Sequence, residues 1–514
     1  MLILFLIGIS VYLYLPIRSS SQPFIDWNNP EQLNRFWASL TRKTHGSTLD
    51  LISSKYKTSE NFSDGVKFYF SHILKNLGFI GILLVIFGLD ISSYFGLSLF
   101  LSWLFSSMFF IYKANMPPNP HAFAILEAHF LLPNVVIWVW FMLGIFFVYN
   151  RYSYVFKYLI VVILYILSFN ILENYKKLNK RNNFYAYDYS INVLRTVPSK
   201  SIIVVKEDVQ LFSLWYKSIV EKNRKDVHII PTGLSGSIWY KEMYSRRYKE
   251  KPFIGPLNNN QEWEEFIKQN FNFGYKIFIS YDVELPQIKN FILKPHGLLL
   301  KVLERKDNEK VFTDFLFENI YILRGRYIYD LNFDFFCSDL IEDYSKALLN
   351  SGHWLTKHKI MGLKNEYFYK YSILMNPIYP YGYFELGYFY YLLSLLDDAL
   401  IWYKTSAKKF EEYIELAKKY KAFDDVVNEI RMNLANCYLH LGVVLEKKGM
   451  RDEAINVYNK SLEYNPYFAD AYYNLAVIYW YKKDWYKVKY YLEQTLKLNP
   501  YHKEAKFFLN LISQ

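Results

Sequence analysis

The sequence predicts an α-helical membrane bundle of about five spans, followed by a small α/β domain and an all-α repeat solenoid. Three observations lead to this fold class. The first third of the 514 residues is strongly apolar, whereas the remainder is charged and rich in tyrosine. Short β-branched runs then flank a helical pattern, which indicates a small sheet. Towards the carboxyl end, the dipeptide Asn-Pro recurs after 34 residues, as expected of stacked helical repeats.

Apolar segments define a transmembrane region, predicted over residues 1–172. A spanning helix needs about 20 apolar residues. Segments of about this length are Phe68–Gly88, Tyr94–Tyr112, Phe123–Tyr149 and Tyr154–Leu172. The apolar run over residues 1–15 is shorter. No basic residue precedes it and no small-residue cleavage site follows it, so a signal peptide fits badly. We therefore expect this run to be the end of a helix.

An external loop is predicted over residues 17–67, where Pro16 ends the first helix and Arg18 marks the polar boundary. The stretch Tyr12–Gly46 reads YLYLPIRSSSQPFIDWNNPEQLNRFWASLTRKTHG. Its aromatic residues and prolines alternate with cations that include Arg18 and Arg42. Aromatic rings beside cations suit the headgroup layer of a membrane. The alternative is an interfacial loop of any multipass protein.

The order of the motifs in this stretch is Y-L-P-I-R-S, then P-x-I-x-W-x-N-P, then R-F-W and T-R-K, over about thirty residues. It resembles the internal loop of the multipass protein O-mannosyltransferases, which are membrane glycosyltransferases of the GT-C type. A second stretch is similar to the same family. It comprises Asp208, Phe212, Tyr216, Arg224, Asp226, Val227, Trp239 and Tyr240, with P-H-G-L-L-L-K-V further on. The resemblance covers residues 1 to about 305.

The resemblance implies an activity and a missing part. Enzymes of the family pass a sugar, mannose in the best-known members, from a polyprenyl-phosphate carrier to a protein hydroxyl. Their catalytic carboxylate lies in the first external loop and removes the acceptor proton. That loop is not in this sequence, so we assign no catalytic residue and expect a split or incomplete enzyme, with a separate amino-terminal half as a candidate partner. No cofactor is expected beyond the polyprenyl-phosphate sugar as donor substrate.

Five residues are candidates for binding the lipid phosphate or another substrate. They are Arg18, Arg42, Glu127, His129 and Asp208. The two arginines can hold a phosphate through several N–H groups. Glu127 and His129 lie just inside the predicted span Phe123–Tyr149, where ionisable residues suggest a functional site. The family has Glu and an Arg here, and His129 stands near the place of the Arg. An interfacial pair facing headgroups is the alternative.

A soluble α/β domain is predicted over residues 173–330. Strands are expected at 201–206, 227–230, 276–280 and 297–302, with a helix at 210–221 between the first two. This strand–helix–strand order indicates a parallel pair. Asp208 then follows the carboxyl end of a strand, where polar residues of such sheets line the ligand crevice. The alternative is that Asp208 caps the helix that follows.

Tetratricopeptide repeats are predicted over residues 331–514. The dipeptide Asn-Pro occurs at residues 376, 465 and 499, and small residues recur with a spacing of 12 in Gly387 and Ala399 and in Gly442 and Ala454. Small residues at this spacing let two antiparallel helices approach each other. Residues 404–425 are extra and indicate a lengthened helix. Such repeats predict binding of an acceptor protein or another protein partner.

Charge and cysteine content restrict the other partners. The net charge is +12, but the cations are scattered and no basic nucleic-acid motif occurs, so we expect contact with membrane lipid and none with nucleic acid. The two cysteines provide no disulfide framework and no metal-ligand cluster, and we assign no metal site.

The function expected from the sequence is that of the carboxyl-terminal portion of a membrane glycosyltransferase. It would move a mannose-like sugar from a polyprenyl-phosphate carrier to a protein hydroxyl, with the repeats binding the acceptor or a partner. The alternative is a non-enzymatic, membrane-anchored repeat scaffold that assembles envelope proteins. The scaffold hypothesis requires only the spans and the repeats. It does not explain why two stretches of the sequence resemble the enzyme family.

Membrane orientation follows from the family topology. It places the first loop and the carboxyl-terminal half outside the cytoplasm, and we expect this in a bacterial inner membrane. The charge count favours the opposite orientation, because Lys180, Arg181 and other cations follow the last span. We favour the family topology, since the spans that would set the orientation first are not in this sequence.

Reporter fusions after Asn183 test this orientation. A reporter that is active only in the cytoplasm should be silent there, and one that is active only outside should give signal. Activity of the cytoplasmic reporter would show that the carboxyl-terminal half faces the cytoplasm and would exclude an external acceptor.

Overall fold

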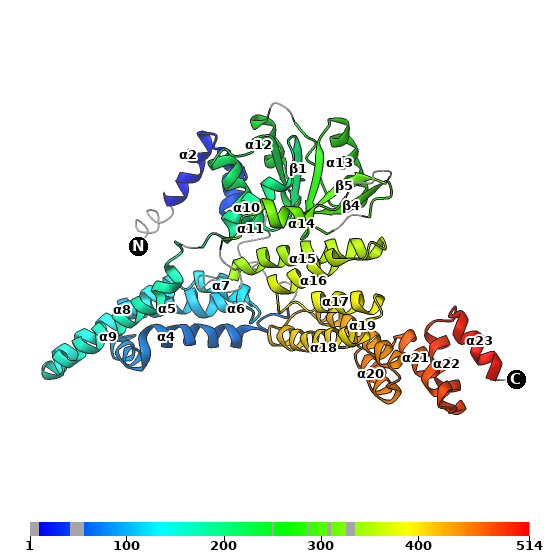
Figure 1. The fold of residues 1–514 in the computed structure, drawn as a ribbon. Coiled ribbons are helices and arrows are strands. Elements are labelled where there is room, and N and C mark those ends of the chain that lie inside the picture. Colours follow the sequence, from blue (N-terminus) through cyan, green and yellow to red (C-terminus); the bar gives the residue numbers. More distant parts are fainter. Residues whose placement is uncertain are drawn as a thin grey trace. The chain divides into compact units, whose positions relative to one another are not determined.

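The computed structural model describes residues 10–41, 56–181, 183–248, 251–284, 287–305, 310–324 and 335–512. The chain forms two compact units that interleave in sequence. The first comprises Met1–Phe184, Gly233–Pro256 and Tyr329–Cys337. The second comprises Tyr185–Thr232, Leu257–Ile328 and Ser338–Gln514. The division into three domains predicted from the sequence stays a prediction. Figure 1 shows the helices and the single sheet along the chain.

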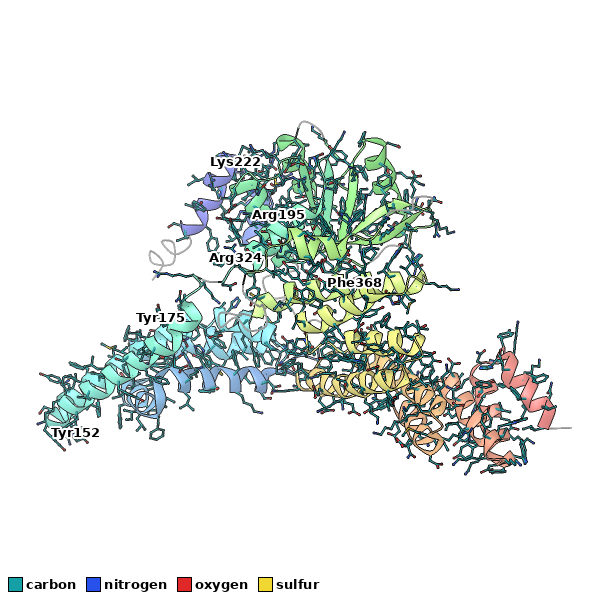
Figure 2. The ribbon with its side chains drawn as sticks, in the orientation of Figure 1. Tyr152, Tyr175, Arg195, Lys222, Arg324 and Phe368 are labelled. Carbon is teal, nitrogen blue, oxygen red and sulfur yellow. The ribbon has the colours of Figure 1, made fainter. Side chains whose placement is uncertain are left out.

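Four helices in the described part of the first unit are long and apolar enough to cross a membrane. They are α4 (Phe62–Gly88), the continuous run Tyr94–Ala114, α8 (Leu131–Arg151) and the segment Phe156–Tyr175 of α9 (Ser153–Leu178). The run Tyr94–Ala114 consists of α5 (Tyr94–Leu104), a π-helical turn (Phe105–Phe109) and α6 (Phe110–Ala114). Tyr152 and Tyr175 lie near the two ends of α9 (Figure 2). Most of the predicted first span, residues 1–9, lies outside the described residues.

Two predicted boundaries of the membrane region are wrong. Pro16 does not end the first helix, because it lies in the first turn of α2 (Tyr14–Ser20). A proline is tolerated there, since the N–H groups of a first turn have no partner within the helix. The helix α4 begins at Phe62, so the last residues of the predicted loop 17–67 are helical.

The predicted span Phe123–Tyr149 is divided into two helices. The first, α7, covers Pro120–Ala128, and its N-cap Asn119 accepts a hydrogen bond from the N–H of Ala122 at 2.7 Å. The second, α8, begins at Leu131. Pro133 has no N–H to continue the hydrogen-bond ladder of α7, so the helix is interrupted and a new one starts. Glu127 and His129 therefore precede the spanning helix rather than lying inside it.

The helices α4 and α8 approach each other closely through glycine. A Cβ atom on Gly88 would stand 1.9 Å from the carbonyl oxygen of Trp140, and one on Gly144 would stand 1.8 Å from that of Leu84. Small residues permit such contact between helices inside a membrane, where packing replaces the hydrophobic effect as the driving force. The core of this bundle is apolar and aromatic and includes Tyr69, Phe130 and Trp140.

The second unit contains a five-stranded sheet with the order β2-β1-β3-β5-β4. Its strands are β1 (Ser201–Val205), β2 (Val227–Pro231), β3 (Lys276–Ser280), β4 (Phe291–His296) and β5 (Leu299–Glu304). The central strand β1 runs parallel to β2 and β3, which confirms the predicted parallel unit. The strands β4 and β5 form an antiparallel hairpin that turns at Gly297, whose φ is +60°.

Strand β4 was missed by the sequence prediction. Its sequence FILKPH contains Pro295, which cannot donate to a ladder and is unusual in a central strand. Because β4 is an edge strand, the proline is tolerated. The predicted last strand, 297–302, begins instead at Leu299, since Gly297 belongs to the turn. Helices of the second unit around the sheet are α10 (Tyr185–Thr196), α11 (Asp208–Trp215), α13 (Asn260–Asn272) and α14 (Thr313–Phe315).

The repeats form consecutive antiparallel helix pairs (Figure 1). These helices are α15 (Phe335–Lys357), α16 (Leu363–Met375), α17 (Tyr381–Leu392), α18 (Leu396–Lys419), α19 (Asp424–Lys447), α20 (Arg451–Tyr464), α21 (Ala469–Tyr481), α22 (Trp485–Leu498) and α23 (Lys503–Ile512). A lengthened helix was predicted from the extra residues 404–425, and the part of this segment up to Lys419 does lengthen α18, whereas Asp424 begins α19. Ala399 and Ala454, two of the predicted small positions, are fully buried.

One contact recurs in the first three pairs, where a glycine on one helix faces a buried tyrosine on the next. A Cβ on Gly352 would stand 2.6 Å from the Tyr369 ring, one on Gly387 would stand 3.0 Å from Tyr403, and one on Gly442 would stand 2.3 Å from Tyr458. The absence of a side chain therefore allows the tyrosine to fill the space between the helices.

A buried serine accompanies this contact in the same pairs. Ser372, Ser406 and Ser461 each donate to a backbone carbonyl of a preceding segment, at Ser345 (2.9 Å), Pro380 (3.1 Å) and Ala435 (2.7 Å). These bonds satisfy hydroxyl groups that would otherwise be costly to bury. Sequence analysis did not single out this series.

We predict that Gly442→Leu destabilises the solenoid by about 1–3 kcal/mol, because the new side chain overpacks the contact with Tyr458. Circular dichroism of a fragment covering residues 335–514 should give a helical spectrum, and the variant should melt at a lower temperature. Met432→Leu, at an exposed position of the same helix, is the control. A strand-rich spectrum, or a Gly442→Leu fragment that melts like the parent, would contradict this packing.

Candidate functional site

A polar centre lies among the membrane helices, around His72 of α4. Its Nδ1 is 3.4 Å from Oε1 of Glu127 on α7. Its Nε2 is 2.9 Å from the side-chain amide nitrogen of Asn76 and 3.2 Å from that of Asn134 on α8. Because an amide nitrogen only donates, Nε2 accepts. The proton of a neutral ring then lies on Nδ1, where it faces the Glu127 carboxylate.

Asparagine extends this polar centre to a fourth helix. The side-chain nitrogen of Asn170 on α9 donates to the backbone carbonyl of Asn76 at 2.5 Å and to that of Ile166 at 2.9 Å. The polar centre, defined as His72, Asn76, Glu127, Asn134 and Asn170, therefore joins α4, α7, α8 and α9. Polar groups that are paired within a membrane bundle mark functional positions.

Aromatic side chains border the polar centre. The Phe130 ring is fully buried and lies 5.8 Å from the ring of His72 and 4.7 Å from that of Tyr69. The Tyr69 hydroxyl accepts a hydrogen bond from the indole of Trp103 at 3.0 Å. The His72 side chain is 18% exposed and that of Glu127 is 56% exposed. The centre is therefore enclosed on the histidine side and accessible at the carboxylate.

The two candidate residues Glu127 and His129 have different contacts. Glu127 contacts His72, whereas the His129 ring stacks on Phe110 with centroids 4.6 Å apart. The Nδ1 of His129 is also 2.9 Å from the carbonyl of Ile125. Sequence reasoning missed His72, although an imidazole within an apolar helix was a signal that could have been used.

The first loop is folded around buried polar residues. Ser19 donates to the Asp26 carboxylate at 2.9 Å, and the Asn28 side chain donates to Ser39 Oγ at 2.8 Å. Arg18 is exposed and donates to Ser21 Oγ at 2.7 Å. Arg42 lies outside the described residues. The loop helix α3 (Leu33–Leu40) carries Arg35, which faces another part of the same unit.

That part is helix α12 (Ile238–Arg247). Both terminal nitrogens of Arg35 donate to the Glu242 carboxylate, at 2.9 and 3.2 Å. This hydrogen-bonded pair lowers the pKa of Glu242 and raises that of Arg35. The Trp27 and Trp239 rings lie 5.2 Å apart. Two stretches singled out in the sequence, the first loop and Trp239-Tyr240, are therefore in contact.

Asp208 is the first residue of α11 and is exposed, with Glu207 as the N-cap. The Glu207 side chain makes no capping hydrogen bond, and Asp208 lies within the helix rather than at its N-cap. As the first helical residue, Asp208 still places a negative charge at the positive end of α11. The structure thus puts Asp208 at the strand end, as expected from the sequence, without a cation beside it in any described contact.

Other carboxyl groups gather at this strand end. Asp282, after β3, accepts hydrogen bonds from the backbone N–H groups of Lys206 (3.2 Å) and Glu207 (2.8 Å). Asp343 on α15 is buried and accepts from Gln210 at 2.5 Å. Burial and the charges of Asp282 and Glu207 raise the pKa of Asp343. Partial desolvation, with the charges of Asp282 and Asp339, raises the pKa of Glu207 to about 7.

This acidic strand end disfavours an anion such as a phosphate, because like charges repel. It also shows no metal centre: within the residues that the structure describes, no group of three or more His, Cys, Asp or Glu side chains is placed to hold a metal ion. The polar centre in the membrane unit is therefore the better candidate for a functional site.

Comparisons with known proteins identify two matching family models and a relative in Dictyostelium discoideum. A family model described as TMEM260-associated domain 2 matches residues 186–311, and a TPR repeat model matches residues 451–482. The protein O-mannosyl-transferase tmem260 of Dictyostelium discoideum is 25% identical over 346 residues, which cover 60% of this chain and 42% of the relative. The chain therefore spans less than half the length of this relative.

Two solved structures are also similar. One is YrrB, described as a TPR protein with an unusual peptide-binding site. The match has 19% identity and a TM-score of 0.18, and it covers 33% of this chain and 95% of the YrrB chain. The match to the APC/C hetero-tetramer Cut9–Hcn1 has 16% identity and a TM-score of 0.21. It covers 36% of this chain and 41% of the chain in that structure.

These findings confirm the resemblance to protein O-mannosyltransferases and the tetratricopeptide repeats. The chain has candidate spanning helices, a small sheet and TPR repeats, and over part of its length it is similar to a relative named as a protein O-mannosyl-transferase.

The raised pKa of Glu207 predicts a pH-dependent stability. The folded chain holds this proton up to about pH 7, whereas an unfolded chain releases it near the ordinary value of 4.5. The free energy of unfolding therefore falls as the pH rises through this window. Glu207→Gln should melt like the parent at pH 5 and at a higher temperature at pH 8.

Thermal melts of the full chain in detergent measure this difference. Glu453→Gln, an exposed glutamate of the solenoid, is the matched control and should show no pH-dependent gain. If Glu207→Gln lost stability at pH 8, or gained equally at both pH values, the raised pKa would be wrong.

Proposed function

We propose that the chain acts as the carboxyl-terminal portion of a membrane glycosyltransferase. It moves a mannose-like sugar from a polyprenyl-phosphate carrier to a protein hydroxyl, together with a part that supplies the catalytic carboxylate. The name of the Dictyostelium relative supports the class of reaction. The observation that supports the proposal is the polar centre around His72, because paired hydrogen-bonding groups within a membrane bundle would suit the hydroxyl groups of a sugar.

The polar centre suits the hydroxyl groups of a sugar better than a phosphate. Its one acidic side chain, Glu127, repels an anion when ionised. A carboxylate accepts several hydroxyl hydrogen bonds, and amide groups such as that of Asn134 both donate and accept. Glu127 is more exposed than His72, so its carboxylate would accept hydrogen bonds from the sugar hydroxyls.

The lipid phosphate is assigned to cations of the first loop. Arg18 is exposed and lies in the matched loop, and Arg42 follows in the same loop sequence. A guanidinium offers several N–H donors in a planar fork, which fits phosphate oxygens. Arg35 is already engaged by Glu242, so it serves the loop structure rather than the phosphate.

The repeats are assigned to the acceptor protein or to a partner. Stacked helix pairs present a continuous surface, and tetratricopeptide repeats in general bind peptides or proteins with it. We place the carboxyl-terminal half outside the cytoplasm of a bacterial inner membrane, where envelope proteins could be modified.

Donor binding tests the assignment of the two sites. The full chain, reconstituted with a photoreactive polyprenyl-phosphate mannose, should become labelled. Glu127→Gln and Arg42→Ala should each reduce labelling by about tenfold, and Arg42→Lys should restore only part of it, since a point charge lacks the fork geometry. Lys489→Met, on the exposed face of α22, is the control and should label like the parent.

Competition with lipid analogues separates the roles of the two residues. Polyprenyl phosphate without sugar should compete equally well in the parent and in Glu127→Gln, but poorly in Arg42→Ala. Unchanged labelling in both variants would contradict the proposal. If no sugar-bearing lipid reduced the labelling, the result would instead favour the membrane-anchored scaffold.

A further inference from the structure

A cavity of about 750 Å³ opens within the second unit, away from the strand end described above. It is bordered by the edge hairpin of the sheet, the end of α15 and the beginning of α16. Phe368, labelled in Figure 2, is one of its lining residues and lies on α16. This volume lies within the range of about 300–1,000 Å³ that is usual for small-molecule sites.

Cations predominate in the lining of the cavity. Lys294, Arg305, Lys310 and Lys364 line it, against a single carboxylate, Asp314, among the lining residues. Asp314 pairs with Lys364 at 2.6 Å. A concave surface with excess positive charge concentrates anions, because its low-dielectric walls focus the field. The cavity therefore favours a negatively charged ligand.

Lys294 is the most deeply placed of these cations. Its residue is only 6% exposed, although it lies on the edge strand β4. Its ammonium is 5.7 Å from the centre of the Trp354 ring, an arrangement that stabilises a cation. Lys294 is therefore a nearly buried lysine at the sheet edge whose side chain borders the cavity.

The amino-terminal end of α16 adds a second attraction for anions. Its N-cap is Gly362, which has no side chain to bond the first N–H groups of the helix. Asn365 instead accepts from the N–H of Gly362 at 3.1 Å, which fixes the turn. Apart from Gly362 itself and its chain neighbours, nothing lies within 4 Å of the position that a Cβ on Gly362 would take, so there is free space beside the helix end. The positive end of a helix dipole binds phosphate well.

One wall of the cavity is aromatic. The Trp354 and His358 rings are stacked, with centroids 4.2 Å apart, and the His358 Nδ1 lies 2.8 Å from the Trp354 carbonyl. The buried Phe368 adds a further ring. Flat apolar surfaces of this kind pack against a sugar or a base. The ligand is therefore expected to combine an anionic group with a ring.

We propose that this cavity binds a phosphorylated small molecule that contains a ring. The phosphate lies at Lys294, Lys364 and the amino-terminal end of α16, and the ring packs on Trp354. This site is separate from the polar centre, and its occupation does not depend on the sugar transfer proposed above.

Isothermal titration of the full chain in detergent tests the proposal. The probes are mannose 1-phosphate, a nucleoside monophosphate, inorganic phosphate and, as an acidic peptide, oligoglutamate. At least one of the two ring-bearing phosphates should bind more tightly than inorganic phosphate, and the tighter one identifies the ring. Lys364→Glu and Lys294→Met should each weaken that binding by about tenfold or more.

Matched variants complete the experiment. Lys489→Met removes an exposed cation of α22 and should leave binding unchanged. Lys364 is 65% exposed, so its substitution tests the site even if Lys294→Met fails to fold. The proposal is overturned if neither ring-bearing phosphate binds, if binding is unaffected by Lys364→Glu, or if only an acidic peptide such as oligoglutamate binds. The last result would indicate a protein-docking surface.

Discussion

A polar group inside a lipid bilayer must find its hydrogen-bond partner within the protein, since no water is available there. His72 meets this constraint through Asn76, Asn134 and Glu127, which come from three helices. The imidazole ring of His72 thus links α4, α7 and α8, and the close contact between α4 and α8 at Gly88 and Gly144 fits the same arrangement.

The same constraint explains the first loop. A loop that buries Ser19, Asp26 and Asn28 is stable only because their side chains bond to one another and to nearby groups. The Arg35–Glu242 pair then fixes the loop to α12, although the two residues are more than two hundred positions apart in the chain. Two stretches that are far apart in the sequence thus form the two sides of one packed structure.

Sequence patterns predicted the elements whose signals are local. Apolar length indicated the spanning helices, β-branched runs indicated β1, β2 and β3, and the recurring spacing of small residues indicated the solenoid, including the contact position of Gly442. Local patterns could not reveal β4, because a proline is acceptable only when a strand lies at an edge, and this depends on the whole sheet.

The candidate site was predictable only in part. Glu127 was identified from its place beside a span, but its partner His72 comes from a different helix, and that pairing arises from packing that no spacing encodes. His129 was nearer in sequence, yet its ring stacks on Phe110 because the chain turns between α7 and α8. The cationic cavity likewise combines residues from β4, α15 and α16, which are adjacent only in the folded chain.

Nitrogen-15 NMR of histidine-labelled full chain in detergent tests the polar centre most directly, with the His72 signals assigned by their loss in His72→Phe. The account predicts that Nδ1 carries a proton and that Nε2 accepts hydrogen bonds. A proton on Nε2 would contradict the hydrogen-bonded centre on which the sugar-binding proposal depends.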